Sequence, residues 1–513
     1  MSRVRGAGSV GMGLSAARDA RPIRAGERIH VLGAAGAGAS AAVLLAHYAG
    51  AAVSGCDPGG HSPYTPPMET LGISLAGGHD PRHVTGVPPP DRLAVTKALT
   101  AIDPNNAELE AARAAGIPIE PWQQVVADAA FGRTLVGVAG THGKSTTAGW
   151  LVHVLVQAGL DPAAFVGALL PGSITGGLPS TARPGRGRPF VVEADEYAGN
   201  FDPFRPEVAV LTSAEWDHPD VFADGAAVVD CFVAWLERAA GSVAGPILVA
   251  NLADTGVRAV VDRLRGWSGR FVATSLVQAG STVGAAPAPA VGEGEWLLGR
   301  IVSADAAGTV VALEGSSISR PVKTRLRLAG RHNAANALGV AGAALALGVS
   351  PDGVASGLAS FEGVGRRLER KGEGRGVVVY DDYGHHPTAI RETLAAIRQR
   401  EPGKRIWAVY EPLTYHRTAA MLERFAEVLA QADGVAIADI WASRDPDTTI
   451  TSAAALAEAV ARRNPDIVAA APGPVEATAA WLAAQVRSGD AVLVMGGGRS
   501  YRIAELLVEA LSK

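Results

Sequence analysis

A glycine-rich turn between an apolar run and a helical run constrains the fold of this chain more than any other feature. Residues 135–138 are typical of the end of a buried strand, and residues 148–156 are typical of a helix. Gly140 and Gly143 allow the backbone to reverse between them. Such a turn gathers amide N–H groups at a helix N-terminus, where the helix dipole favours an anion. The segment predicts an anion-binding loop in an α/β sheet.

The residues after the turn point to a nucleoside triphosphate. Lys144 supplies a positive charge for the β- and γ-phosphates, and Ser145 supplies a hydroxyl for Mg²⁺. Five residues rather than four separate Gly137 from Gly143, so the strict Walker pattern is not met. A purely structural turn is the alternative, and the Gly-Lys-Ser-Thr-Thr run argues against it. The expected ATP-binding residues of the loop are Gly140, Thr141, Gly143, Lys144, Ser145 and Thr146.

Composition narrows the class of protein. A chain of 513 residues is too long for one core, and a net charge of −4 without a basic stripe argues against nucleic acid as a partner. No apolar run reaches the roughly 18 residues of a membrane span. Two distant cysteines, Cys56 and Cys231, form no metal-binding or disulfide pattern and fit a reducing compartment. We expect a cytoplasmic monomer or weak homodimer, with residues 1–25 as a flexible extension that lacks a signal-peptide core.

The first domain, expected over residues 26–130, begins with a nucleotide-binding pattern. A strand at 28–32, a glycine turn at 33–38, a helix from residue 40 to about 48 and a strand at 51–54 precede an acid at Asp57. Tight packing of the helix is the alternative explanation for the glycines. The candidate binding residues for a nucleotide-type substrate are Gly33, Gly36, Gly38, Ser40 and Asp57.

The second domain, expected over residues 131–363, carries the phosphate loop and two further strands that end in polar residues. The runs 189–196 and 208–218 end in acids and a histidine, and ligands gather at the carboxyl ends of parallel strands. Ser145, Glu193 and His218 could therefore hold Mg²⁺, although a solvated strand end or a capping role would explain the last two. Asn333 and Asn336 begin a helix and either contact adenine or cap that helix. A Gly/Ala/Pro-rich stretch at 280–295 predicts a surface loop.

The third domain, expected over residues 364–513, predicts a further mostly parallel sheet. Strands at 377–380, 405–410 and 491–495 alternate with helical runs such as 419–431. Tyr383, His385 and His386 follow a strand directly, which favours a substrate site over core or capping roles. The sequence as a whole predicts three α/β domains without an internal repeat.

Eight motifs in order make the chain resemble the Mur ligase family, the ATP-dependent amide-forming enzymes of peptidoglycan assembly. Eight motifs in the family's order are far less probable by chance than one motif alone. The resemblance spans nearly all of the chain beyond the N-terminal extension. The motifs are GAAGAGAS (33–40), SGCD (54–57), GTHGKSTT (140–147), VEADE (192–196), EWDHPD (215–220), RHNAAN (331–336), GRRLE (365–369) and DDYGHHPT (381–388).

The resemblance implies an N-terminal Rossmann-like domain that binds UDP-N-acetylmuramate, a central P-loop ATPase domain and a C-terminal Rossmann-like domain. ATP and Mg²⁺ would be the cofactors, with adenine against Asn333 and Asn336. The amino-acid pocket would be lined by Tyr383, His385 and Arg417. The implied catalytic residues are Lys144, Glu193, His218 and Arg367, and the implied Mg²⁺ ligands are Ser145, Glu193 and His218.

The implied reaction activates the carboxylate of UDP-N-acetylmuramate as an acyl phosphate, which the amine of L-alanine then attacks. Two departures lie on the expected amino-acid side. Leu413 replaces a usual histidine while His416 introduces one, and Arg499 replaces a usual acid. A sister branch of the family recycles a ready-made tripeptide, and Tyr197 looks like that branch. The run 415–418 fits the alanine-adding branch better.

Two other functional classes remain as alternatives. A dinucleotide-dependent oxidoreductase would explain the N-terminal glycine turn but not the Lys144 loop with Glu193 and His218. A non-catalytic nucleotide switch would bind ATP without releasing phosphate in the presence of a UDP-sugar and an amine. Nicotinamide binding and phosphate release distinguish these classes from a ligase.

Overall fold

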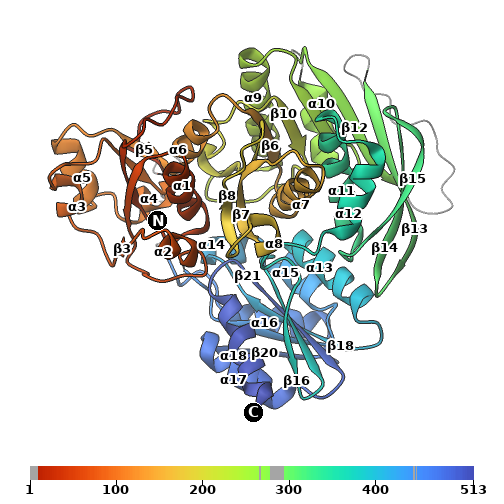
Figure 1. Cartoon of the computed structure of the whole chain (residues 1–513). Helices are drawn as coiled ribbons and strands as arrows, with labels where there is room; N and C mark the ends of the chain where they lie inside the picture. Colours follow the sequence, from red (N-terminus) through yellow and green to blue (C-terminus); the bar gives the residue numbers. More distant parts are fainter. Residues whose placement is uncertain (1–9, 265–266, 278–293, 443–444, 446) are drawn as a thin grey trace.

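Three β-sheets, each formed by one stretch of the chain, organise the molecule (Figure 1). The computed structural model describes residues 10–264, 267–277, 294–442, 445 and 447–513. The predicted α/β class with three domains and mostly parallel sheets is confirmed. Most of the loop that we predicted at 280–295 lies outside the described residues. Within the described ranges, no helix is long and apolar enough to span a bilayer.

The N-terminal sheet has the strand order β3-β2-β1-β4-β5, and all of its strands are parallel. Helices α1 and α6 pack on one face, and α3 and α5 cover the other. Strand β1 is central, so its carboxyl end leads into the glycine turn between two neighbouring strand ends. The elements are β1 (Arg28–Leu32), α1 (Ala37–Tyr48), β2 (Ala52–Cys56), α2 (Pro66–Thr70), β3 (Leu75–Ala76), α3 (Arg82–Thr85), β4 (Arg92–Val95), α4 (Lys97–Ile102), α5 (Ala107–Ala114), β5 (Ile119–Pro121) and α6 (Trp122–Ala129).

Residues 10–24 do not form the flexible extension that we expected. The Arg18 guanidinium donates hydrogen bonds to Glu120 and to Asp128, each over 2.8 Å. Both acids are at least nine-tenths buried, and Arg92 is buried beside them. Because a buried carboxylate needs charged or hydrogen-bonding partners, Arg18 holds this segment against the N-terminal sheet.

The central sheet has ten strands in the order β15-β14-β13-β12-β11-β10-β6-β9-β7-β8. It is parallel from β13 to β7 and antiparallel at both edges. Strand β6 lies between β9 and β10, which brings the ends of the three predicted site strands together. The strands are β6 (Thr134–Ala139), β7 (Ala163–Leu170), β8 (Ser180–Arg183), β9 (Pro189–Ala194), β10 (Val208–Leu211), β11 (Ile247–Asn251), β12 (Arg270–Val277), β13 (Glu295–Asp305), β14 (Gly308–Gly315) and β15 (Ile318–Leu326).

Helices cover both faces of the central sheet. Helices α9 and α10 bury apolar residues on one face, and α7, α11 and α12 do so on the other. The helices are α7 (Lys144–Gln157), α8 (Gly172–Thr175), the 3₁₀ turn η2 (Tyr197–Gly199), α9 (Gly225–Ser242), α10 (Thr255–Arg263), α11 (Arg331–Ala346) and α12 (Pro351–Ser360).

The C-terminal sheet has six strands in the order β16-β17-β21-β18-β19-β20, of which only β16 is antiparallel. The helix predicted over 419–431 is divided at Met421, and its first part begins at Tyr415 because Thr414 caps it. The elements are β16 (Glu369–Gly374), β17 (Val377–Asp382), α13 (Pro387–Arg400), β18 (Arg405–Glu411), α14 (Tyr415–Ala420), α15 (Leu422–Leu429), β19 (Gly434–Ala438), α16 (Ala453–Arg463), β20 (Val468–Gly473), α17 (Val475–Gln485), β21 (Asp490–Gly496) and α18 (Ser500–Ser512).

The domains meet through helices that lie beside the phosphate loop. Helix α1 packs against β7 and β8 of the central sheet, and α13 packs against α11 and β13. In Figure 1 the blue C-terminal domain lies below the other two, with α13 and α15 facing the central domain. The carboxyl ends of strands from all three sheets therefore border one region.

Candidate active site

The phosphate loop is built by a glycine in the left-handed region. Gly143 caps helix α7 at φ 82°, a conformation that glycine adopts without steric cost. The helix begins at Lys144, four residues before the start at 148 that we predicted. A Cβ on Gly143 would lie 2.5 Å from Asn336 Oδ1, so a larger residue would be strained at this φ and would displace Asn336. The loop therefore presents the first turn of α7 to an anion.

Lys144 lies across the loop within a group of acids. Its Nζ donates to the Gly140 carbonyl over 2.7 Å and to Glu196 Oε2 over 3.0 Å, and it lies 3.5 Å from Asp195 Oδ1. Burial alone would lower the pKa of Lys144, but the acids outweigh burial and raise it. The residue is thus a permanent positive charge at the phosphate loop.

Ser145 and Glu193 form a pair of oxygen donors below the loop. The Ser145 hydroxyl donates to Glu193 Oε1 over 2.9 Å, and the other carboxylate oxygen accepts from the Gly167 amide over 2.6 Å. Arg367 reaches the same hydroxyl from the segment between the central and C-terminal domains, at 2.8 Å. The structure therefore brings three predicted residues from distant parts of the sequence into direct contact.

His218 lies near the two acids that contact Lys144. Its ligand atoms, with those of Asp195 and Glu196, lie within 4.8 Å of one another. Burial lowers the pKa of His218, so the ring is neutral at pH 7. Its Nδ1 lies 3.1 Å from Arg417 Nη2, and because arginine only donates, the neutral ring carries its proton on Nε2 in this arrangement. His218 would have to exchange this contact in order to bind a cation.

The predicted catalytic and amino-acid-binding residues line one cavity of about 370 Å³. A second cavity of about 340 Å³ contains Asn333 and Asn336, and the two cavities share Gly143 and Arg367. A nucleotide with its base in the second cavity would place its phosphates at the loop. The catalytic cavity includes Lys144, Ser145, Glu193, His218, Arg367, Tyr383, His385 and Arg417.

Arg417 is the buried cation on the C-terminal side of the catalytic cavity. It is 2% exposed and forms an ion pair with Asp217 Oδ1 over 2.7 Å. Its Nε and Nη1 atoms are buried and have no hydrogen-bond partner among the residues that the structure describes. A buried guanidinium with free donors is suited to a carboxylate ligand.

His385 and His386 have different roles. Burial and the nearby Arg417 charge hold the pKa of His385 well below its usual value, and its Nδ1 lies 3.0 Å from the Tyr383 carbonyl. His386 instead caps helix α13 and lies 3.2 Å from the Trp216 carbonyl. The capping alternative therefore describes His386, and both histidines line the catalytic cavity.

Glu215 ties the phosphate loop to the C-terminal domain. Its carboxylate lies 3.0 Å from His142 Nε2 and accepts from Thr388 Oγ1 over 2.9 Å and from Arg424 Nη2 over 2.7 Å. Burial opposes ionisation, but His142, His386 and Thr388 outweigh it and lower the pKa of Glu215 to about 2. These contacts hold the C-terminal domain over the loop.

Family models match three successive stretches of the chain. Residues 28–133 match the Mur ligase family catalytic domain, residues 138–344 the Mur ligase middle domain and residues 366–498 the Mur ligase glutamate ligase domain. A UDP-N-acetylmuramate–L-alanine ligase of Kineococcus radiotolerans is 38% identical over 478 residues, covering 92% of this chain and 93% of that protein. This chain belongs to the Mur ligase family. The membership predicted from the motifs is confirmed.

Further relatives of this Mur ligase extend the comparison. A UDP-N-acetylmuramate–L-alanine ligase of Roseiflexus sp. is 34% identical and covers 94% of this chain and 98% of its own length. The solved UDP-N-acetylmuramate-alanine ligase of Thermotoga maritima has a TM-score of 0.73 at 22% identity, covering 94% and 98% of the two chains. A murein peptide ligase of Psychrobacter arcticus gives 0.69 at 24% identity, covering 95% and 99%. Both solved structures bear on the fold alone.

The two departures from the family pattern occupy different positions relative to the catalytic cavity of this Mur ligase. Leu413 lines the catalytic cavity in place of the usual histidine. The new histidine, His416, pairs with Asp445 over 3.1 Å. Arg499 has an exposed side chain and pairs with Glu476 over 3.1 Å. Only Leu413 therefore changes the lining of the catalytic cavity.

The N-terminal glycine turn combines ligand-facing and structural residues. Gly33 has φ 75°, and Asp57 holds the turn by accepting from the Ala35 amide over 3.1 Å. Gly38 lines the catalytic cavity, and Gly36 caps helix α1. Ser40 is fully buried, and its hydroxyl lies 3.0 Å from Thr181 Oγ1 of the central domain. The side chain of Ser40 thus joins the N-terminal and central domains.

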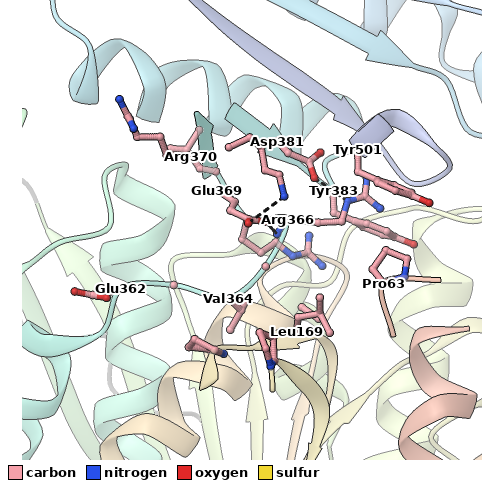
Figure 2. Close-up of a pocket in the computed structure, with 18 of the residues that line it drawn as sticks. Pro63, Leu169, Glu362, Val364, Arg366, Glu369, Arg370, Asp381, Tyr383 and Tyr501 are labelled. Atoms are coloured by element: carbon pink, nitrogen blue, oxygen red, sulfur yellow. Dashed lines mark hydrogen bonds and ion pairs between the residues drawn. The ribbon is translucent and has the colours of Figure 1, made fainter. Parts of the chain in front are cut away.

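A third cavity of about 410 Å³ contains residues that sequence reasoning missed. Figure 2 shows Arg366, Tyr383 and Tyr501 close together, with Pro63 beside Tyr383 and with Leu169 and Val364 below them. The Arg366 guanidinium lies 5.0 Å from the Tyr383 ring centre and 5.2 Å from that of Tyr501, and it pairs with Asp381 over 3.0 Å. The arginine doublet in GRRLE was a usable signal for Arg366, whereas no local pattern marked Tyr501.

Proposed function

We propose that this Mur ligase joins L-alanine to the carboxylate of UDP-N-acetylmuramate at the expense of ATP, in peptidoglycan precursor synthesis. Relatives with that name are 34% to 38% identical over nearly their whole length. The observation that carries the proposal is the meeting of Lys144, Arg367 and Arg417 on one cavity. They come from the phosphate loop, the interdomain segment and the C-terminal domain.

The first step uses the cations around the phosphate loop. The muramate carboxylate attacks the γ-phosphorus of ATP, which forms an acyl phosphate and releases ADP. Lys144 and Arg367 offset the charge on the phosphoryl oxygens, which is the main contribution a protein makes to phosphoryl transfer. Lys144 would leave Glu196 for the phosphates, and Arg367 already lies against the loop at Ser145.

Mg²⁺ fits the oxygen donors beside the loop. Ser145 and Glu193 supply a hydroxyl and a carboxylate, which are ligand types that Mg²⁺ prefers, and His218 would complete the set. Asp195 and Glu196 provide further oxygens near His218. When bound there, Mg²⁺ would neutralise phosphate charge and orient the triphosphate.

The second step uses the amino-acid side of the cavity. The free Nε and Nη1 donors of Arg417 would bind the carboxylate of L-alanine. His385 is neutral, and with Nδ1 donating to the Tyr383 carbonyl its Nε2 can accept a hydrogen bond from the amino group. The amine attacks the acyl carbon, the amide bond forms and phosphate leaves. The C-terminal domain covers the loop and would limit hydrolysis of the acyl phosphate.

We infer that the substrates are UDP-N-acetylmuramate and L-alanine and that the enzyme works in the cytoplasm, as a monomer or weak homodimer. The adenine would lie in the cavity that contains Asn333 and Asn336. The UDP portion would lie near the turn with Gly33, Gly36 and Gly38. Ser40 and Asp57 would support that turn through Thr181 and the Ala35 amide.

Phosphate release from ATP tests the proposal. The purified chain is assayed with Mg²⁺ and UDP-N-acetylmuramate, and with L-alanine, glycine, L-serine or the tripeptide L-alanyl-γ-D-glutamyl-meso-diaminopimelate. We expect release that depends on both substrates and is fastest with L-alanine. Release with the tripeptide alone would assign the chain to the recycling branch instead, and no release with any amine would contradict the proposal.

A further inference from the structure

Four potential metal ligands lie together in the N-terminal domain, on the sheet face opposite α1. His30 is on β1, Cys56 ends β2, His83 is on α3 and Glu108 is on α5. One ligand atom from each lies within 4.8 Å of all the others. His30, Cys56 and Glu108 are at most 2% exposed. This cluster belongs to neither the phosphate loop nor the amino-acid pocket.

Hydrogen bonds alone do not satisfy the cluster. Glu108 Oε1 lies 3.2 Å from Cys56 Sγ, 3.0 Å from His83 Nδ1 and 2.8 Å from the Asp80 amide, which is three donors for two lone pairs. Glu108 Oε2 and His30 Nε2 are 3.2 Å apart, yet both are buried and neither has a hydrogen-bond partner in the described chain. The two atoms are in contact but are not aligned as a hydrogen bond, and buried polar atoms in this arrangement are costly unless a cation lies between them.

A neighbouring hydroxyl orients His30 toward the cluster. His30 Nδ1 lies 2.8 Å from Ser54 Oγ, so Nδ1 can donate to that hydroxyl and Nε2 then carries a free lone pair. A hydrogen bond to the remote ring nitrogen is the usual support of a metal-bound histidine. His79 adds a further nitrogen, with Nδ1 at 3.3 Å from Cys56 Sγ.

We propose that His30, Cys56, His83 and Glu108 form a zinc site that ties α3 and α5 to the strands of the N-terminal sheet. Two nitrogens, one sulfur and one carboxylate oxygen are a donor set typical of Zn²⁺ and unsuited to Mg²⁺. Tetrahedral Zn²⁺ sites separate their ligand atoms by about 3.3–3.8 Å. Cys56 Sγ and His83 Nδ1 lie 3.2 and 3.0 Å from Glu108 Oε1, and one ligand atom from each of the four residues lies within 4.8 Å of the others, so side-chain adjustments would bring the set to these separations.

Zinc binding at this site releases a proton. While no cation is bound, the Cys56 thiol keeps its proton and donates it to Glu108 Oε1 over 3.2 Å. A divalent ion displaces that proton because it binds the thiolate. Affinity for zinc therefore rises with pH.

The site lies next to the substrate turn. The amides of Gly33 and Ala34 donate to the Cys56 carbonyl over 2.9 and 3.1 Å, and Asp57 follows directly. An ion bound by Cys56 would therefore hold the end of β2 and, through it, the turn that we assign to the UDP portion. This role is structural and does not depend on the chemistry of the ATP site.

Metal content tests the proposal independently of activity. The chelator-treated full chain is titrated with Zn²⁺ in excess Mg²⁺, which keeps the oxygen ligands of the ATP site occupied. Metal per chain and thermal unfolding are then measured. We expect one zinc per chain and a rise in Tm. Failure to retain zinc at about 10 μM, an affinity far weaker than zinc sites reach, would overturn the proposal.

Matched variants locate the ion. Cys56→Ala and His83→Gln should each weaken zinc binding at least tenfold, since each removes a ligand. Cys231→Ala and His61→Ala, at positions outside the cluster, should bind as the unaltered chain does. Co²⁺ in place of zinc should give a thiolate-to-cobalt absorption band that Cys56→Ala abolishes. Unchanged binding in His83→Gln, whose side chain is partly exposed and whose loss the fold can tolerate, would place the ion elsewhere and overturn the assignment.

Discussion

The Arg367 guanidinium donates a hydrogen bond to the Ser145 hydroxyl over 2.8 Å. Arg367 lies in the segment that joins the central and C-terminal domains, and Ser145 lies in the first turn of the phosphate-loop helix. The same hydroxyl donates to Glu193, so the three residues form a chain of contacts. Arg367 Nε is buried without a partner among the described residues and can serve a phosphate oxygen. The contact thereby joins the first turn of the phosphate-loop helix to the segment that leads into the C-terminal domain.

Replacement of Arg367 tests this link. In Arg367→Ala we expect kcat for ATP-dependent phosphate release to fall by about 10²-fold, the effect of removing one preorganised donor to developing charge. Arg370→Ala is the matched control, because Arg370 is exposed and pairs with Glu373. Equal kcat in the Arg367 variant and the control would show that Arg367 does not act on the triphosphate.

Lys144→Ala should lower the turnover rate more than Arg367→Ala does. Lys144 is the charged residue of the phosphate loop, and we expect phosphate release to fall by about 10³-fold or more. Binding of the UDP substrate, measured by calorimetry, should persist, because that substrate is assigned to the N-terminal domain. Lys404→Ala, a surface lysine paired with Glu401 over 3.0 Å, serves as the control. Near-normal turnover of Lys144→Ala would refute the site.

In the proposed reaction, Arg417 binds the carboxylate of the amino acid. Arg417→Lys keeps a positive charge beside Asp217 but loses the forked donors, so KM for L-alanine should rise at least about tenfold while KM for ATP stays within about twofold. Arg499→Ala, at the other departure from the family pattern, should leave both constants unchanged because its side chain is exposed. A larger rise in KM for ATP than in KM for L-alanine would contradict the role assigned to Arg417.

Glu411 should make the fold less stable as pH rises. Burial raises the pKa of Glu411 from its usual 4.5 to about 7, and its Oε2 has no hydrogen-bond partner within the described chain. The unfolded chain therefore loses this proton at a lower pH than the folded chain. The free energy of unfolding falls between about pH 4.5 and pH 7, by at most about 3 kcal/mol.

Urea denaturation of Glu411→Gln provides the measurement. The variant should be more stable than the unaltered chain at pH 8, and the difference should shrink toward pH 4.5, where the carboxyl is neutral in both states. Glu476→Gln, an exposed acid paired with Arg499, is the control and should show no such trend. A variant that loses stability equally at pH 5 and pH 8 would contradict the prediction.

Local patterns were sufficient for much of the site. Local conformational preferences predict a strand, a glycine turn and a helix in this order, so the sequence alone predicted the position of the loop that contains Gly143 and Lys144. Glu193 follows from the rule that polar residues at the ends of parallel strands share an edge, and β9 does lie beside β6. The contact of Ser40 with Thr181 was not predicted, because a hydroxyl after a glycine turn suits either a ligand or a domain contact and only the tertiary structure shows the packing.

The sequence by itself determined the α/β class, the family and the glycine loop before Lys144, because these are read from local patterns: alternating strand and helix runs, short motifs in a fixed order and a glycine turn. Only the tertiary structure decided that Arg417 meets Asp217, that Arg366 lies between Tyr383 and Tyr501, and that His30 faces Glu108. Such contacts depend on strand order and domain packing, which bring together residues far apart in the chain. Burial then strengthens the electrostatic interactions between these residues, because two charges that are shielded from water interact more strongly than two charges in water.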